Sequence, residues 1–204
     1  MATRSAGKLH ELGPMILSAG FTPLTLDDAG IARAPEEASV EAFDTFEQNA
    51  IAKARWFFER ARSLGTRAPD AVLAEDSGLE VLALGGAPGV RSKRWSGSTL
   101  EEAALEAANN AKLLGALSGV ADRRARYVCV AAIISARGEV HARGECGGVI
   151  LESPRGAGGF GYDPYFFSDE LAKTFGEATR AEKEGASHRA RAVAAVLELF
   201  HSGM

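Results

Sequence analysis

The stretch Tyr127-Val-Cys-Val-Ala-Ala-Ile-Ile-Ser135 is almost continuously apolar, which predicts a β-strand that is buried on both faces. The chain turns near Arg137-Gly138 and returns through residues 139–151, so this strand is expected to open a hairpin. Helix-like and strand-like segments alternate along the rest of the chain, without internal repeats or a low-complexity linker. The sequence therefore predicts an α/β fold in a single domain that spans residues 1–204.

Apolar spacing and capping residues predict four helices. Residues 8–19 have helical spacing and end before Gly20, and Gly13-Pro14 is expected to kink or restart this helix. Thr45-Phe-Glu-Gln48 is a capping box, and the helix after it should bury Phe46, Ala50, Ile51, Ala54, Phe57, Phe58 and Ala61. Thr99-Leu-Glu-Glu102 caps an alanine-rich helix that ends near Leu117. Ser187 caps the last helix, whose apolar stripe is Val193, Val196, Leu197 and Phe200.

Two short strands complete the expected pattern. Phe21–Leu26 has the composition of a strand, and an acidic loop over residues 27–44 follows it. Ala71–Ala74 is a short apolar strand, which we expect to end in Glu75-Asp-Ser-Gly78.

Composition excludes several classes of function. A net charge of −4 argues against general binding to nucleic acids or membrane surfaces, and no apolar run approaches the about 20 residues of a bilayer span. The first residues lack the apolar segment of a secretory signal. Cys129 and Cys146 lack metal-ligand spacing and are too few for a disulfide scaffold. We expect a cytoplasmic protein in which these two thiols are reduced, and they lie opposite each other if the hairpin turn has two residues.

Two segments have the residue types that bind phosphates and cations. Thr3-Arg-Ser-Ala-Gly-Lys8 brings hydroxyls, a glycine and a lysine to a helix start, which suits a triphosphate tail, although such a lysine is often only solvated. Glu75 and Asp76 follow an apolar strand directly, and adjacent carboxylates there suit Mg²⁺. The alternative for the acidic pair is a turn with solvated side chains. Glu36, Glu37 or Glu41 could supply a further ligand.

Three further positions are candidates for ligand binding. His188 and Arg189 lie in the first turn of the last helix, where the macrodipole disfavours cations, so an anion or a carbonyl should compensate them. Lys183 precedes them, and Lys53 faces away from the apolar stripe of its helix. The stretch Gly156-Ala-Gly-Gly-Phe-Gly-Tyr-Asp-Pro-Tyr-Phe-Phe167 satisfies G-x-G-x-x-G, but no helix is expected after it, so it does not predict a dinucleotide site. Its glycines allow close backbone approach, and Phe160 or Tyr162 offers a flat face for a base.

Six blocks in this order resemble the inosine triphosphate pyrophosphatase family, the Ham1/RdgB-like enzymes for non-canonical purine nucleoside triphosphates. The blocks are Thr3-Arg-Ser-Ala-Gly-Lys8, Thr45-Phe-Glu-Gln-Asn-Ala50, Glu75-Asp-Ser-Gly-Leu79, Gly85-Gly-Ala-Pro-Gly89, Gly158-Gly-Phe-Gly-Tyr-Asp-Pro164, and Ala181-Glu-Lys183 with Ser187-His-Arg189. The resemblance implies a long twisted mixed β-sheet with flanking helices and two lobes around a central nucleotide cleft. It also implies a homodimer that needs Mg²⁺ and hydrolyses ITP, dITP and XTP to the monophosphate and pyrophosphate.

The resemblance also implies roles for individual residues. Glu41 and Asp76 match the magnesium ligands, and Asp76 also matches the catalytic acid. Residues implied to bind substrate are Thr3, Arg4, Ser5, Ala6, Gly7, Lys8, Lys53, Ser77, Phe160, Gly161, Tyr162, Asp163, Lys183, His188 and Arg189. Of these, the residues from Phe160 onward match the base-recognition set. His188 and Arg189 would donate hydrogen bonds to the 6-oxo group of a purine, and they would find no acceptor in the 6-amino group of adenine.

The chain departs from the family pattern at three places. Only Met1 and Ala2 precede the Thr3–Lys8 segment, where the family has an apolar strand, so we expect the true start to lie upstream. Ser5 replaces a usual Asn, and Gln48 and Glu75 replace a usual Glu and a frequent Asp. Two other functions stay open: a nucleotide-binding protein that has lost turnover, and a Maf-like hydrolase for other modified nucleotides.

Overall fold

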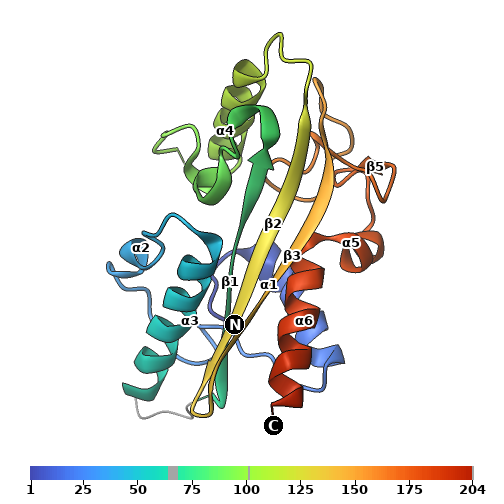
Figure 1. The fold of residues 1–204 in the computed structure, drawn as a ribbon. Helices are drawn as coiled ribbons and strands as arrows, with labels where there is room; N and C mark the ends of the chain where they lie inside the picture. The colour runs from blue at the N-terminus through green and yellow to red at the C-terminus, as the bar shows by residue number, and fades with distance from the viewer. Residues whose placement is uncertain (64–68, 101, 204) are drawn as a thin grey trace. The chain divides into compact units, whose positions relative to one another are not determined.

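A computed structural model describes residues 1–63, 69–100 and 102–203, and these residues form a mixed α/β structure (Figure 1). The helices are α1 (Ala6–Ser18), α2 (Glu37–Val40), α3 (Phe46–Ser63), α4 (Glu102–Ala116), α5 (Arg180–Ala186) and α6 (His188–Ser202), with 3₁₀ helices η1 (Leu82–Leu84) and η2 (Gly89–Arg94). The strands are β1 (Ala71–Val81), β2 (Arg124–Ser135), β3 (Gly138–Ile150), β4 (Phe166–Ser168) and β5 (Lys173–Thr174). They form one sheet in the order β1-β2-β3-β4-β5, and both β3–β4 and β4–β5 are antiparallel. The predicted α/β fold class is confirmed.

The chain divides into two compact units. Unit 1 comprises residues 1–76, 129–144 and 189–204, and unit 2 comprises residues 77–128 and 145–188. The backbone passes from one unit to the other within β1, β2 and β3 and at the start of α6, so neither unit is a continuous segment of sequence. The expected single domain and the expected cleft between two lobes stay predictions.

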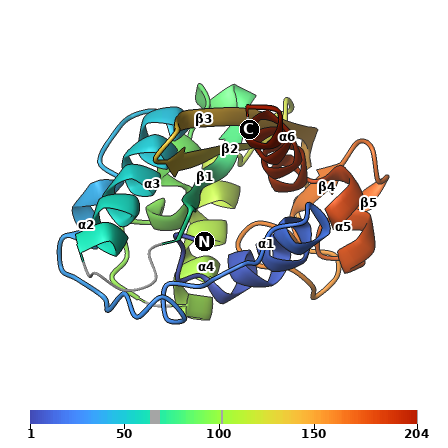
Figure 2. The ribbon, with the colours of Figure 1, turned by 90° about the horizontal axis from the view of Figure 1, so that it is seen from below.

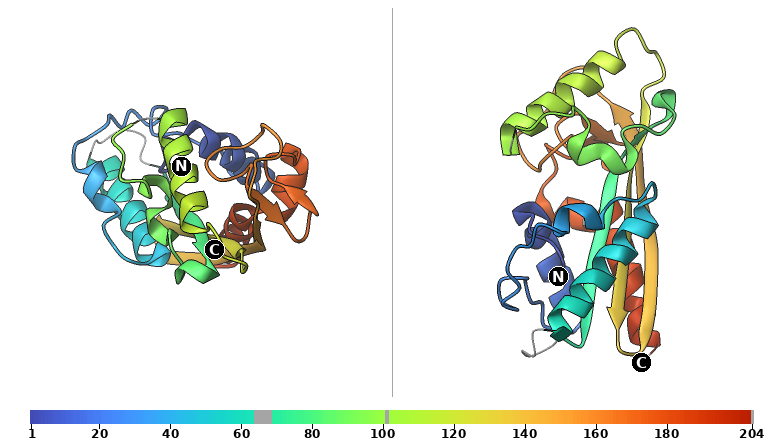
Figure 3. Two further views of the ribbon diagram at one scale, coloured as in Figure 1. Left: turned by 90° about the horizontal axis from the view of Figure 1, so that it is seen from above. Right: turned by 90° about the vertical axis from the view of Figure 1, so that its left-hand side faces the viewer.

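Unit 1 has its core on the strands that the apolar stretch predicted. Alternate residues Cys129, Ala131 and Ile133 of β2 pack with Leu73 of β1, and the partners from α1 and α6 are Leu12, Ile16, Ala192, Val193, Val196 and Leu197. Val130, Ala132 and Ile134, on the opposite face of β2, are also buried. Figures 1 and 2 show α3 on one side of these strands and α1 with α6 on the other. The right-hand view of Figure 3 shows the same layers, with α3 in front of the strands. The prediction that β2 is covered on both faces is confirmed.

Unit 2 has a separate core around aromatic side chains. Tyr127, Phe166 and Phe175 pack with Leu79, Val81, Leu113, Leu117, Ala125, Cys146, Ile150 and Tyr162. The ring of Tyr127 lies 4.7 Å from that of Phe166 and 5.7 Å from that of Phe175, between ring centroids. This cluster fixes the strand ends from which the glycine-rich segment after β3 departs.

Three predicted elements differ from the structure. Residues 21–26 form no strand, because Pro23 has no N–H for a ladder and the Phe21 N–H ends α1 by donating to the Ile16 carbonyl (3.1 Å). The β1 strand does not end at Ala74 but continues to Val81, so Glu75 and Asp76 lie inside a strand rather than in a turn. The helix α1 also runs unbroken through Pro14 instead of restarting there.

The structure agrees more closely with the predicted helices than with the predicted short strands. The Thr45 hydroxyl accepts a hydrogen bond from the Gln48 N–H at the start of α3 (3.2 Å). The predicted face of α3 is buried apart from Ile51, which is half-buried, and Asn49 is buried as well. The helix α6 begins directly after Ser187, and α4 ends at Ala116. The predicted cap at Thr99–Glu102 lies partly outside the described residues.

The two cysteines are free and buried in different cores, Cys129 in unit 1 and Cys146 in unit 2. The Cys146 thiol lies 3.6 Å from the Ser168 hydroxyl. The expected reduced state therefore agrees with the structure. Among the described residues, no helix is long and apolar enough to cross a membrane.

Glycine at position 148 is required by the close approach of β3 and β4. A Cβ atom there would lie 2.2 Å from the Phe167 carbonyl oxygen and 2.8 Å from the Phe166 ring. At the neighbouring Gly147 the nearest atom would be Asp169 Oδ2, at 3.5 Å. We predict that Gly148→Ala lowers the free energy of unfolding by about 2–4 kcal/mol, because backbone has to move. Gly147→Ala is the matched control and should change it by less than about 0.5 kcal/mol. Equal effects of the two substitutions in denaturant titrations would contradict the close approach.

Candidate active site

The adjacent acids Glu75 and Asp76 point to opposite faces of the sheet, because successive side chains of a strand alternate. Glu75 lies on the face of Leu73 and Cys129, which α1 and α6 cover. Asp76 lies on the other face and contacts α3. Their side chains are buried, with relative exposures of 2% for Glu75 and 8% for Asp76. Solvated acids in a turn, the alternative left open by the sequence, are therefore excluded.

Glu75 is held by cations from two helices. Its Oε1 lies 2.5 Å from Lys8 Nζ of α1, and its Oε2 lies 3.7 Å from Arg189 Nε of α6. The Cys129 thiol donates to the same Oε2 (3.5 Å). Burial would raise the pKa of Glu75, but Lys8, Arg189 and Lys53 outweigh it and hold that pKa well below its usual value. Glu75 is consequently a buried carboxylate that stays charged.

Arg189 completes this network through a second carboxylate. Its Nη1 also contacts Oε2 of Glu11 on α1. Burial opposes the charge, but Glu75 and Glu11 raise the pKa of Arg189 above its usual value. A cation in the first turn of a helix needs a compensating anion, and for Arg189 the anions are Glu75 and Glu11. Arg189 belongs to unit 1 with them, whereas the other predicted base-binding residues belong to unit 2, so its contact with a base stays a prediction.

Asp76 has a different environment. Its Oδ2 accepts a hydrogen bond from Asn49 Nδ2 of α3 (2.9 Å). Burial raises the pKa of Asp76 from 3.8 to about 6, Lys8 and the Asn49 bond lower it, and Glu41 and Glu75 raise it further. A carboxyl whose pKa is about 6 can both hold and release a proton near neutral pH.

Lys53 forms an ion pair with Glu41, the second predicted metal ligand. Its Nζ lies 2.6 Å from Glu41 Oε1 and 3.5 Å from the Glu75 carbonyl oxygen. Burial disfavours its charge, but Glu41, Glu75 and Asp76 together raise the pKa of Lys53 above 10.5. Lys8, Lys53, Glu41 and Asp76 therefore form one charged cluster, and each of the two lysines is paired with an acid.

This cluster fits a magnesium ion that is shared with phosphates. Within the described ranges, no group of three or more His, Cys, Asp or Glu side chains is placed to hold a metal alone. Glu41 and Asp76 supply oxygen ligands, whereas Glu75 is occupied by Lys8 and Arg189. Mg²⁺ typically takes one or two protein carboxylates and completes its shell with water and substrate phosphates. The donor set thus suits Mg²⁺ bound together with a polyphosphate.

The Thr3–Lys8 segment forms the N-terminus of α1, as predicted. Ser5 is the N-cap, and its hydroxyl accepts from the Lys8 N–H (3.5 Å). Thr3 is buried and its hydroxyl accepts from the Ser5 N–H (3.2 Å). The Ala2 N–H donates to the Leu73 carbonyl (2.8 Å), which ties the segment to β1. Ala6 and Gly7 are in the first turn, where helical N–H groups have no helical acceptor and can bind an anion.

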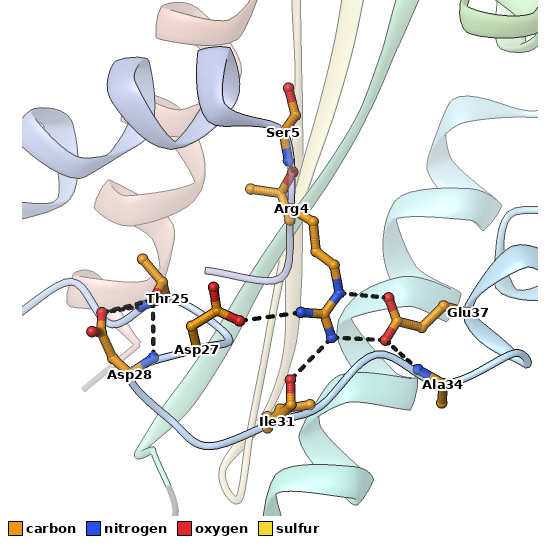
Figure 4. A network of polar contacts seen from close by, with 9 residues as sticks. Arg4, Ser5, Thr25, Asp27, Asp28, Ile31, Ala34 and Glu37 are labelled. Atoms are coloured by element: carbon orange, nitrogen blue, oxygen red, sulfur yellow. Dashed lines mark hydrogen bonds and ion pairs between the residues drawn. The ribbon is translucent and has the colours of Figure 1, made fainter. Parts of the chain in front are cut away.

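Arg4 points away from this turn and into the acidic segment (Figure 4). It makes two hydrogen bonds to Glu37, at 2.9 and 2.8 Å, and one to the Ile31 carbonyl at 3.0 Å. Asp27 lies 3.4 Å from its Nη1. The guanidinium therefore links residues 27–37 to the Thr3–Lys8 segment. A contact between Arg4 and substrate stays a prediction.

Unit 2 contains the second group of predicted residues, centred on Asp163. Its Oδ2 accepts from Lys183 Nζ (2.9 Å) and from the Phe160 N–H (3.0 Å), while its Oδ1 accepts from the Tyr127 hydroxyl (3.2 Å). The Lys183 ammonium also lies 5.4 Å from the ring centroids of both Phe160 and Phe175. These contacts bring Phe160, Asp163 and Lys183 together as predicted.

His188 joins the same group by stacking. Its ring lies 4.6 Å from that of Tyr127, with an interplanar angle of 8°. The side chain is buried, so the solvated helix start considered from sequence is wrong for His188 as well as for Arg189. The C-cap of α5, Ser187, is also buried.

Hydrogen bonds and close contacts hold the glycine-rich loop and give its two aromatic rings different environments. Gly159 has φ +74°, and a Cβ there would lie 2.1 Å from Asp163 Oδ2. The Gly161 carbonyl accepts from Asn110 (3.0 Å). Tyr162 turns inward, where its hydroxyl donates to the Ser92 carbonyl (2.8 Å) and burial raises its pKa. Tyr162 is thus a core residue, and Phe160 is the half-buried ring of the pair. No helix follows the loop but strand β4, so the G-x-G-x-x-G match is indeed accidental.

Three residues to which the sequence assigned no role take part in these groups, and a fourth caps the helix that carries Lys183. The three are Glu11, Asn49 and Tyr127, and the fourth is Thr179. Thr179 begins α5 with a complete capping box to Glu182, a pattern readable from Thr179-Arg-Ala-Glu182. Asn49 was visible as a polar residue one turn before Lys53. The contacts of Glu11 and Tyr127 depend on residues far away in sequence. Ser77, a predicted substrate contact, is half-buried in β1 next to Asp76.

Comparison with known proteins matches this arrangement to one family. The Ham1 family profile covers residues 1–199. The chain belongs to the Ham1 family. A relative named dITP/XTP pyrophosphatase from Mycolicibacterium paratuberculosis is 47% identical over 199 residues, which are 95% of this chain and 90% of the relative.

Solved structures of the Ham1 family have the same fold. The Ham1 protein of Staphylococcus aureus superposes with a TM-score of 0.79 at 31% identity, covering 100% of this chain and 97% of that protein. The nucleoside-triphosphatase (dITP/XTP pyrophosphatase) of Mycobacterium abscessus gives a TM-score of 0.68 at 39% identity, with 96% of each chain covered. The resemblance noted from six sequence blocks is thereby confirmed.

Asp76 is predicted to lower the stability of this Ham1 protein at neutral pH. Its folded pKa of about 6 lies above 3.8, so the folded state binds the proton more tightly than the unfolded state. The carboxylate therefore destabilises the fold fully above about pH 6 and not at all below about pH 4. At about 1.4 kcal/mol per pKa unit, Asp76→Asn should raise the free energy of unfolding at pH 8 by up to about 3 kcal/mol. This gain should shrink at pH 4.

Denaturant titrations in EDTA measure this effect without bound metal. Asp70→Asn, at an exposed position just before β1, is the control and should show no such pH-dependent gain. An Asp76→Asn variant that is less stable than wild type at pH 8 would show that the buried carboxylate is fully compensated.

Proposed function

We propose that this chain hydrolyses dITP, ITP and XTP to the nucleoside monophosphate and pyrophosphate. The observation that carries the proposal is the charged cluster of Lys8, Glu41, Lys53 and Asp76 in a member of the Ham1 family. The relatives named dITP/XTP pyrophosphatase support the substrate class. Removal of these triphosphates clears deaminated purines from the nucleotide pool.

The residues of unit 1 suit cleavage between the α- and β-phosphorus atoms. A water oxygen attacks the α-phosphorus, its proton passes to the Asp76 carboxylate, and the bond to the bridging oxygen breaks to release pyrophosphate. The pKa of Asp76, about 6, makes this carboxylate a base that is deprotonated at neutral pH. Lys8 and Lys53 attract the phosphate oxygens, and the N–H groups of Ala6 and Gly7 add donors.

Mg²⁺ is the proposed cofactor, and Glu41 and Asp76 are its proposed ligands. When bound, it would neutralise the negative charge that develops on the phosphate oxygens. The triphosphate brings about four negative charges to a site that already holds carboxylates. The lysines and the metal ion would offset the repulsion between them.

The residues of unit 2 suit recognition of a 6-oxo purine. Phe160 offers a ring face for the base, and Lys183 and His188 offer donors for its oxygen. Asp163 and Tyr127 hold these groups in place. Adenine presents an amino donor instead of the oxygen, so a buried donor would lose its partner at a cost of about 1–3 kcal/mol.

Two alternatives remain distinguishable by experiment. A nucleotide-binding protein without turnover would bind ITP but release no pyrophosphate. A Maf-like hydrolase would cleave other modified nucleotides and leave XTP intact. A homodimer is also proposed from the family resemblance, and size-exclusion chromatography with light scattering tests it. The cytoplasmic location expected from the sequence stays a prediction.

The function is tested by pyrophosphate release from a panel of triphosphates with Mg²⁺. We expect dITP and XTP to be cleaved at least about 100-fold more efficiently than dATP, as kcat/KM. Asp76→Asn should lower kcat by about 10²–10⁴-fold, because the base is lost, while dITP binding persists. Equal turnover of dATP, or full activity of Asp76→Asn, would contradict the proposal.

The role of Lys183 is tested by Lys183→Met, which removes the ammonium but keeps the apolar stem. The ratio of kcat/KM for dITP over dATP should fall by about 10- to 100-fold, the effect of one lost donor to a buried acceptor. Lys173→Met is the matched control, because that lysine pairs with Glu182 on a half-exposed surface of the same unit. An unchanged ratio in Lys183→Met would remove this lysine from base recognition.

A further inference from the structure

The helix α3 fastens both proposed metal ligands through two residues one turn apart. Asn49 binds Asp76, and Lys53 binds Glu41. Residues four apart lie on the same face of a helix, so these two side chains leave α3 together. The family resemblance implies substrate binding for Lys53, but it implies no role for Asn49, which lies in the block Thr45–Ala50. What Asn49 does is therefore open.

The Asn49 side chain is buried and makes three hydrogen bonds. Its relative exposure is 1%. Its Oδ1 accepts from the Phe43 N–H (2.9 Å), and its Nδ2 donates to the Phe43 carbonyl (3.1 Å) and to Asp76 Oδ2 (2.9 Å). Only one orientation of the amide satisfies these bonds, since oxygen must face the N–H and nitrogen must face the two acceptors.

These bonds connect two segments of chain that each carry an acid. Phe43 lies two residues after Glu41, in the segment between α2 and α3, while Asp76 lies in β1. The Asn49 amide therefore sets where the Glu41 segment lies relative to the Asp76 carboxylate. Lys53 then holds Glu41 itself at 2.6 Å. All of these residues belong to unit 1.

Asn109, a second buried asparagine, provides a comparison for the hydrogen bonds of Asn49. Asn109 of α4, with an exposure of 5%, accepts from the Ser96 N–H (2.7 Å) and donates to the Lys93 carbonyl (3.0 Å). Asn109 thus fastens a loop to a helix in the same way as Asn49 fastens Phe43. Among the described residues, Asn109 makes no hydrogen bond to a carboxylate, whereas Asn49 donates to the buried carboxylate of Asp76. Loop fastening alone therefore does not account for the Asn49–Asp76 bond.

We propose that Asn49 is a positioning residue that presets the separation and orientation of Asp76 and the Glu41 segment for a divalent cation shared with a triphosphate. This inference rests on the proposed function, since it assigns a role within the same site. Preset ligands lose less conformational freedom when the cation binds, so the cation binds at lower concentration. Asn49 itself touches neither substrate nor metal in this account.

The test compares Asn49→Ala with Asn109→Ala. The half-saturating Mg²⁺ concentration for dITP hydrolysis should rise by at least about 10-fold in Asn49→Ala, the usual range for loss of an outer-shell partner. The KM for dITP at saturating Mg²⁺ should stay within about threefold of wild type, because the base and phosphate contacts remain. Asn109→Ala should keep the wild-type Mg²⁺ dependence while sharing the loss of thermal stability. If Asn49→Ala does not fold, Asn49→Ser, which is too short to bridge Phe43 and Asp76, replaces it.

A second readout separates failure of this inference from failure of the function. Binding of the non-hydrolysable α,β-methylene analogue of dITP is measured by calorimetry as a function of Mg²⁺ concentration. If wild type hydrolyses dITP but Asn49→Ala and Asn109→Ala show the same Mg²⁺ dependence, the inference is wrong and the function stands. If wild type hydrolyses no triphosphate of the panel, the function is wrong, and the calorimetric Mg²⁺ dependence still decides the role of Asn49: a shift supports it and none overturns it.

Discussion

The contact on which unit 1 depends is the buried carboxylate of Glu75 between Lys8 and Arg189. A buried charge without partners is strongly destabilising, and here each partner comes from a different helix, α1 and α6. The Glu11 carboxylate extends the network on the far side of Arg189. Because the strand carries Glu75, the network fixes the N-terminus of α1 against β1 at the level where Asp76 faces α3.

Strand alternation then gives the two neighbouring acids separate roles. Glu75 is surrounded by cations and stays charged, whereas Asp76 is buried with an amide donor and has a pKa of about 6. Two carboxylates one residue apart thus have pKa values shifted in opposite directions, the usual arrangement when one acid is structural and the other exchanges a proton. Lys8 acts on both acids, since it lowers the pKa of each.

The sequence predicted elements whose signals are local, and it failed where the signal was distant. The buried strand β2, the capped helix α3 and the helix after Ser187 follow from periodicity and capping. The predicted strand stopped at Ala74, whereas β1 continues to Val81. Charged residues are rarely buried inside a strand unless they have buried partners, so Glu75 and Asp76 indicated its end. Those partners, Lys8 and Arg189, are far away in the chain, and no local pattern reveals them.

The site was predicted in the same uneven way. The family resemblance pointed to Lys8, Lys53, Asp76 and Lys183, and the structure brings these into two charged or aromatic groups, one in each unit. Two neighbouring aromatic residues of one loop, Phe160 and Tyr162, were equivalent in sequence, and only the inward hydrogen bond from Tyr162 to Ser92 separates them. Asn49 and Tyr127 were missed because an amide on a helix and an aromatic residue in an apolar strand look like ordinary core or surface residues.

The most direct measurement is a crystal structure of Asp76→Asn with dITP and Mg²⁺. We expect triphosphate oxygens within hydrogen-bonding distance of Lys8 and Lys53, with the metal ligated by Glu41. A triphosphate bound away from Lys8, with the Lys8–Glu75 ion pair unchanged from the substrate-free structure, would contradict the proposed roles of Lys8 and Lys53.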